Sequence, residues 1–131
     1  MRTILLILCF FIPSTLAWSN ESKEAEGPVI EYIEFTPKFT VNLAESRKYL
    51  MINVQILAEG AETVARIKKH MPALRHELIM LFTGRPADQV QTMEQREALR
   101  QETIETLHKT LDKLENSDGF RDVFFTEFLI N

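Results

Sequence analysis

Apolar side chains recur at every second position through much of residues 29–43, with polar residues between them. This alternation is typical of a half-buried β-strand, with one face toward a core and one toward solvent. Pro37 cannot donate a ladder hydrogen bond, so it predicts an edge position, a bulge or a break. A loop over residues 43–47 leads to a second alternating run, residues 48–58. We expect the two strands to pair antiparallel.

At Gly60 the spacing of apolar residues changes to three and four, which predicts an amphipathic helix. Pro72 interrupts it and removes one intrahelical hydrogen bond, so we expect a kink or two abutting helices. Gly84 is a natural stop, and Pro86 can open a short helical turn through Val90. The apolar stripe consists of Val64, Ile67, Met71, Leu74, Leu78 and Leu81.

A second helix is predicted to begin at the capping-box pattern of residues 92–95 and to run for about six turns, ending near residues 116–119. Arg96 and Arg100 lie near the edge of its apolar face. We expect them to lie over apolar surface with their charged ends in water. Pairing with a strand carboxylate or with a neighbouring subunit is the alternative. The apolar face consists of Met93, Ile104, Leu107, Leu111 and Leu114.

Residues 119–131, GFRDVFFTEFLIN, return to strand-like alternation. We expect the even positions Phe120, Phe124, Phe128 and Ile130 to pack on the long helix. The odd positions would then share the opposite face with side chains of the second strand. Apolar groups left exposed there often mark an interface. The candidate interface consists of Tyr49, Met51, Leu57, Val123, Phe125 and Leu129.

The predicted order is therefore strand, strand, helix, helix, strand (ββααβ). This order is typical of an α+β fold, with helices packed on one face of a small antiparallel or mixed sheet.

The first 28 residues have a different character. Arg2, an apolar run over residues 4–12 and a small-residue pattern ending at Ala17 indicate a signal peptide over residues 1–17. The apolar run is shorter than the roughly 20 residues of a membrane span, and a short uncleaved membrane anchor is the alternative. Residues 18–28 are polar and acidic, which predicts a flexible linker to a domain over residues 29–131.

Charge and composition disfavour several classes of function. A net charge of −4 over 131 residues disfavours nucleic-acid binding. The single cysteine, Cys9, lies in the N-terminal segment, which leaves the domain without thiol chemistry. The spacing of His70, His76 and His108 favours exposed helix histidines over a metal site. We therefore expect no catalytic, cofactor or metal site, and a binding function instead.

Five stretches, taken in order over about residues 30–131, resemble the periplasmic domain of the flagellar basal-body protein family FliL. Each stretch is mostly a core pattern, and the specificity of the resemblance comes from the ordered set. The last stretch is close to the VYFTEFVIQ-like strand that ends members of that family. The stretches are FTPKFTVNL, RKYLMINVQILAE, MPALRHELIMLFTGRPADQV, MEQREALRQETIETL and VFFTEFLIN.

The resemblance implies a fold related to the stomatin-type scaffold domain and self-association into a ring around the stator units of the flagellar motor. It implies effects on torque, swarming or switching in chemotaxis, no catalysis and no cofactor. It also implies a periplasmic location at the inner membrane, with membrane association through partners or through an uncleaved N-terminal segment.

Two features depart from the family pattern. Members usually carry a cytoplasmic tail and a full transmembrane helix, whereas the apolar segment here begins at residue 3 and is short. Many also have a glycine near the start of the long helix, where this chain has Gln95. A binding module of another periplasmic membrane complex is therefore the alternative function. No residue set supports a third possibility, a small hydrolase or a lectin-like enzyme.

Overall fold

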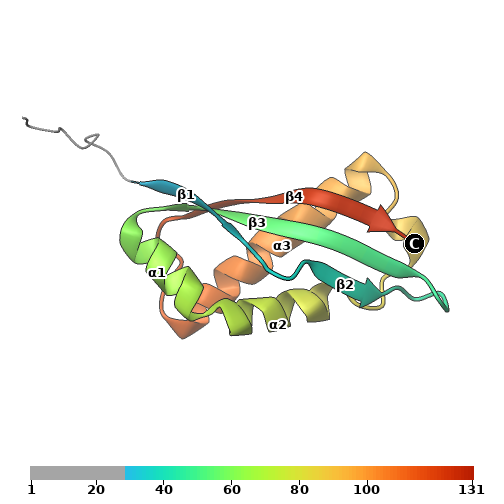
Figure 1. The fold of residues 1–131 in the computed structure, drawn as a ribbon, viewed down its shortest axis with the longest axis horizontal. Coiled ribbons are helices and arrows are strands. Elements are labelled where there is room, and N and C mark those ends of the chain that lie inside the picture. The colour runs from blue at the N-terminus through green and yellow to red at the C-terminus, as the bar shows by residue number, and fades with distance from the viewer. Residues whose placement is uncertain (1–28) are drawn as a thin grey trace, which may run out of the picture.

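A computed structural model describes residues 29–131 (Figure 1). The signal peptide or anchor predicted for residues 1–17 and the linker predicted for residues 18–28 lie outside the described residues. Within them, an antiparallel sheet of four strands packs against three α-helices, which confirms the α+β fold. The elements are β1 (Ile30–Glu34), β2 (Phe39–Asn42), β3 (Tyr49–Glu59), α1 (Ala61–Lys69), α2 (Met71–Phe82), the 3-10 helix η1 (Ala87–Gln89), α3 (Met93–Leu114) and β4 (Phe120–Ile130).

Strand β3 is the centre of the sheet. β1 pairs with its second half, from Ile30 opposite Glu59 onward, and β2 pairs with its first half. β4 pairs along nearly the whole of β3, so β1 and β2 must share the opposite edge. The predicted first strand is therefore broken in two, and Pro37 lies in the break.

The helices cover one face of the sheet (Figure 1). Aromatic rings link the layers: Phe39 of β2 lies 5.5 Å from Phe82 of α2, ring centre to ring centre. Burial of such side chains is the main favourable contribution to folding. The largest fully buried side chains are Phe35, Phe39, Phe82, Leu50, Ile52, Ile56, Ile67, Leu74, Leu78, Leu99, Leu107 and Leu111.

The helix boundaries follow local chemistry. α1 and α2 abut at His70, and Pro72 lies in the first turn of α2, where a missing amide hydrogen costs little. At the start of α3, the Thr92 side chain accepts from the Gln95 amide, and the Gln95 side chain accepts from the Thr92 amide. The two abutting helices and the capping box are thus confirmed.

The apolar face of α3 is only partly as predicted. Leu107 and Leu111 are buried, but Met93 is 87% exposed and Leu114 is 41% exposed. Both are terminal residues of the helix, where packing neighbours lie on one side only. Leu99 and Thr103 are buried in their place.

The predicted faces of β4 are wrong in the middle of the strand. Its pairing with β3 shifts register at two points, between Asn53 and Val54 and between Leu57 and Ala58. Each extra residue in β4 exchanges the two faces. As a result, Val123 and Phe125 lie on the helix-covered face, and Phe124 lies on the opposite face.

Candidate functional site

The described residues hold no group of three or more His, Cys, Asp or Glu side chains that could bind a metal ion. His70 and His108 have structural contacts, whereas His76 is exposed as predicted. His70 Nε2 lies 3.0 Å from Glu115 Oε2. The His70 side chain is only 17% exposed, so the prediction of an exposed histidine is wrong at this position. The His108 ring lies 4.6 Å from the Phe120 ring. These contacts fasten α3 to the rest of the domain.

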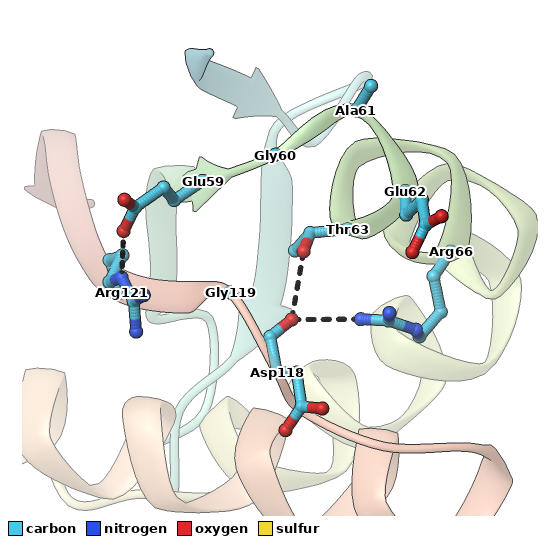
Figure 2. A pocket seen from close by; sticks show the side chains of 9 residues that line it. All are labelled: Glu59, Gly60, Ala61, Glu62, Thr63, Arg66, Asp118, Gly119 and Arg121. Atoms are coloured by element: carbon cyan, nitrogen blue, oxygen red, sulfur yellow. Dashed lines mark hydrogen bonds and ion pairs between the residues drawn. The ribbon is translucent and has the colours of Figure 1, made fainter. Parts of the chain in front are cut away.

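A hollow of about 450 Å³ lies where β3 passes into α1, beside the loop that precedes β4 (Figure 2). Thr63 Oγ1 and Arg66 Nη1 both donate to the Asp118 carbonyl, each at 2.9 Å. Arg121 pairs with Glu59 on the other side of the hollow. These contacts fasten α1 and the end of β3 to the start of β4 and the segment that leads into it.

The face of the sheet opposite the helices carries four of the six predicted interface residues. Tyr49 is 43% exposed and Leu129 is 49% exposed, while Met51 and Leu57 are half-buried. The other two, Val123 and Phe125, are on the helix side, and Val123 is fully buried. Because β-bulges are not visible in a period-two pattern, the sequence assigned these two residues to the wrong face.

Three further apolar residues lie on this open face, and the sequence pattern did not single them out as interface residues. Ile30 and Tyr32 are each 61% exposed, and the Tyr32 ring lies 6.1 Å from that of Phe124. The alternation of Tyr32 with buried Ile33 was a signal for its position. We call Ile30, Tyr32, Leu57 and Phe124 the Tyr32 patch, and Tyr49, Met51 and Leu129 the Tyr49 patch.

A polar band separates the two patches. Asn53 Nδ2 donates to Glu34 Oε1 at 2.6 Å, and Lys38 Nζ donates to Glu127 Oε2 at 2.6 Å. Asn53 and Glu127 are cross-strand partners, which places both interactions at the middle of the face. The buried Asn53 Oδ1 has no hydrogen-bond partner among the described residues. The open face thus consists of two apolar areas with polar groups between them.

A second hollow, of about 330 Å³, lies between the first half of α3 and β4; we call it the α3–β4 groove. The Arg96 guanidinium lies 4.5 Å from the centre of the Phe128 ring, which confirms the predicted position over apolar surface. The groove is lined by Met93, Arg96, Glu97, Arg100, Phe124, Phe125 and Phe128.

Arg100 follows the alternative that the sequence left open. Its Nη1 contacts Asp122 Oδ1 at 2.6 Å and donates to the Val123 carbonyl at 3.0 Å. Its Nη2 donates to Glu97 Oε1 at 2.7 Å. Hydrogen bonds from Arg100 and then from Gln101 lower the pKa of Glu97 to about 2, and the bond to Glu97 raises the pKa of Arg100. The side chain joins α3 to the strand.

Among the helices of residues 29–131, none combines the length and the apolar character that crossing a bilayer requires.

Comparison with known proteins identifies relatives. The chain is 29% identical over 96 residues to the "Flagellar protein FliL" of Aquifex aeolicus (strain VF5), covering 72% of this chain and 57% of that protein. It is 28% identical over 92 residues to the proteins of the same name from Escherichia coli (strain K12) and Shigella flexneri, covering 70% of this chain and 60% of each. The chain thus spans under two thirds of the length of these relatives.

The family described as "Flagellar basal body-associated protein FliL" matches residues 32–130. This range contains β3, all three α-helices and β4. It therefore contains the open face of the sheet and the α3–β4 groove almost entirely. The chain belongs to the FliL family of flagellar basal body-associated proteins.

Proposed function

We propose that this chain is a non-enzymatic accessory protein of the flagellar motor that works by binding stator and basal-body proteins. Family membership supports the flagellar assignment. The location that fits is the periplasm at the inner membrane, with attachment through partners or through an uncleaved N-terminal segment. Sequencing the N-terminus of the exported protein distinguishes these two modes of attachment.

The observation that carries the proposal is the open face of the sheet. Its two patches expose two tyrosines and two aliphatic side chains: Ile30 and Tyr32 are each 61% exposed, Tyr49 is 43% exposed and Leu129 is 49% exposed. Aromatic residues are enriched at protein interfaces. In a single-layer sheet covered by helices on one side only, a second copy or another motor protein would cover these groups.

The binding test replaces one residue in each patch. We expect Tyr32→Glu and Leu129→Glu to reduce self-association of the full chain in sedimentation experiments and to reduce its cross-linking to stator proteins in cells. Met80→Glu is the matched control, because Met80 is 65% exposed but lies on α2, away from the open face. Unchanged association in both patch variants, with the fold intact, would contradict the assignment of this face.

The cellular test uses a deletion strain. We expect flagella to assemble normally but swimming at high viscous load and swarming to be impaired, since stator function limits torque under load. The Tyr32→Glu and Leu129→Glu variants should restore motility less well than Met80→Glu. Normal motility of the deletion strain under high load would instead favour the alternative, a scaffold of another membrane complex.

A further inference from the structure

The outer edge of β4 has a backbone pattern that can be worked out from the observed hydrogen bonds. Tyr49 and Asn131 exchange both backbone hydrogen bonds at 2.9 Å. Leu129 and Glu127 are the next partners at the same spacing, opposite Met51 and Asn53. In an antiparallel pair, the residues between such partners point their backbone amide and carbonyl groups away from the neighbouring strand, here β3. Phe128 and Ile130 therefore direct theirs to the outer edge.

The same reasoning extends past the bulge. The Val54 carbonyl accepts from the Phe35 amide at 3.0 Å, so the backbone groups of Val54 point away from β4. Phe125 lies opposite Val54 and thus also directs its amide and carbonyl outward. Three residues of β4, namely Phe125, Phe128 and Ile130, present backbone donors and acceptors on one edge.

The two halves of this edge differ. At Val123 the outward amide donates to Asp122 Oδ1 at 2.8 Å, and the outward carbonyl accepts from Arg100 at 3.0 Å. Side chains thus occupy the edge there, which is a known protection of edge strands. Within the described residues, no side chain makes a comparable bond to the backbone of Phe125, Phe128 or Ile130. We call residues 125–130 the open edge.

The α3–β4 groove lies beside the open edge and is lined by Phe125 and Phe128 of that same segment. Met93, which is 87% exposed, adds an apolar side chain to the wall of the groove. A strand added to the edge would place alternate side chains on the helix side of the sheet, where this groove can receive one of them.

The groove also has a charge preference. The Arg96 guanidinium lies over Phe128, and its Nε makes only a long hydrogen bond of 3.5 Å to the Val90 carbonyl. Glu97, the carboxylate of the groove, already accepts from Arg100 and Gln101. Among the residues that the structure describes around this groove, Arg96 is therefore the charged group with donors to spare, and it complements a carboxylate.

We propose that the open edge binds an extended acidic segment of a partner protein by strand addition. One apolar side chain of the segment enters the α3–β4 groove, and a neighbouring carboxylate on the same face contacts Arg96. A second copy of this chain fits less well, because two-fold pairing around Phe128 would bring two Arg96 guanidiniums together. This binding mode concerns the edge of the sheet and does not depend on the role proposed for its open face.

The probe is the peptide acetyl-Thr-Glu-Thr-Leu-Thr-Glu-Thr-amide, which places leucine and both glutamates on one face of a strand in either direction. Amide NMR of the full chain in a mild detergent reports binding. We expect shifts and slowed hydrogen exchange at Phe125, Phe128 and Ile130. A peptide with lysine in place of glutamate, and one with N-methyl groups on the backbone, should each bind at least tenfold more weakly.

Protein variants test the residue assignments. We expect Arg96→Gln to weaken binding of the glutamate peptide about tenfold, and Arg96→Glu to favour the lysine peptide. Arg75→Gln is the matched control, since the Arg75 guanidinium also lies 4.5 Å from a ring centre, that of Phe39, but outside the groove. Met93→Ser should weaken binding without loss of stability, because it removes an apolar side chain from the groove and adds no charge.

Three results would overturn the proposal. The first is absence of amide shifts on the open edge with the glutamate peptide. The second is equal binding of the N-methylated peptide, which would mean that the backbone of the edge is not used. The third is a dimer in which the amides of Phe125, Phe128 and Ile130 are protected without peptide, which would assign the edge to a second copy.

Discussion

Arg100 of α3 and Asp122 of β4 are joined by a 2.6 Å contact between Nη1 and Oδ1, and the same nitrogen donates to the Val123 carbonyl. One side chain thus holds a helix against the edge of a strand and also covers part of that edge. Both of these partners lie on β4, 22 and 23 residues away in the chain.

Removing this interaction should destabilise the domain. We expect Arg100→Met to lower the free energy of unfolding by about 1–2 kcal/mol, because hydrogen bonds to charged groups are lost. The effect is not larger because the Asp122 side chain is 35% exposed and solvent screens its charge. Urea denaturation measures it. Arg121→Met is the control: Arg121 is 55% exposed, and its pair with Glu59 should contribute less than about 1 kcal/mol.

The two adjacent phenylalanines of β4 should respond differently to truncation. The centre of the Phe125 ring lies 6.1 Å from that of Phe82 and 5.9 Å from that of Phe128. Phe125→Ala should therefore lower the free energy of unfolding by about 2–3 kcal/mol. Phe124→Ala removes a ring on the open face and should cost less than about 1 kcal/mol in the monomer. Thermal and urea unfolding distinguish the two. The reverse order would contradict the observed bulges.

Gly119 should tolerate no side chain. Its φ is +80°, and an added Cβ would lie 2.0 Å from Thr63 Oγ1 and 2.4 Å from the Glu59 carbonyl oxygen. We expect Gly119→Ala to cost about 3 kcal/mol or more, since backbone must move. Gly84→Ala is the control, with the same φ but nothing within 4 Å. It should cost only the conformational penalty of about 1–2 kcal/mol.

The acid titration of Glu97 tests its interaction with Arg100. The pKa of Glu97 is lowered from 4.5 to about 2, so its contribution to stability is present above pH 4.5 and is lost as the pH falls toward 2. Carboxyl ¹³C NMR should show this low midpoint. Arg100→Gln should raise it toward 4.5. Glu115 should not change, because its pKa is lowered by His70 and Lys69 instead.

The order of elements could be predicted from the sequence because local chemistry decides it. Pro37, Pro72 and the Thr92–Gln95 capping box each act within a few residues, and the structure follows them. The half-buried strands were also visible, since a sheet covered on one side alternates apolar and polar residues.

The faces of β4 could not be predicted in the same way. Phe124 and Phe125 are chemically identical, so the pattern does not say which one packs against the helices. The bulges that decide it depend on pairing with β3, residues far away in the chain. The position of Arg100 likewise depends on a carboxylate that β4 brings to α3. Features set by contacts between distant segments were the ones that the sequence left open.

The central position of β3 has a consequence for how the chain folds. β1 and β2 reach it through short connections, whereas contacts between β3 and β4 join residues 62 to 80 positions apart. Closing so long a loop slows the formation of such contacts. We expect β4 to pair late in folding, so that one edge of the apolar strand β3 stays unpaired until then. Substitutions that weaken β4 should therefore lower the yield of soluble protein through aggregation before they measurably change the folded molecule.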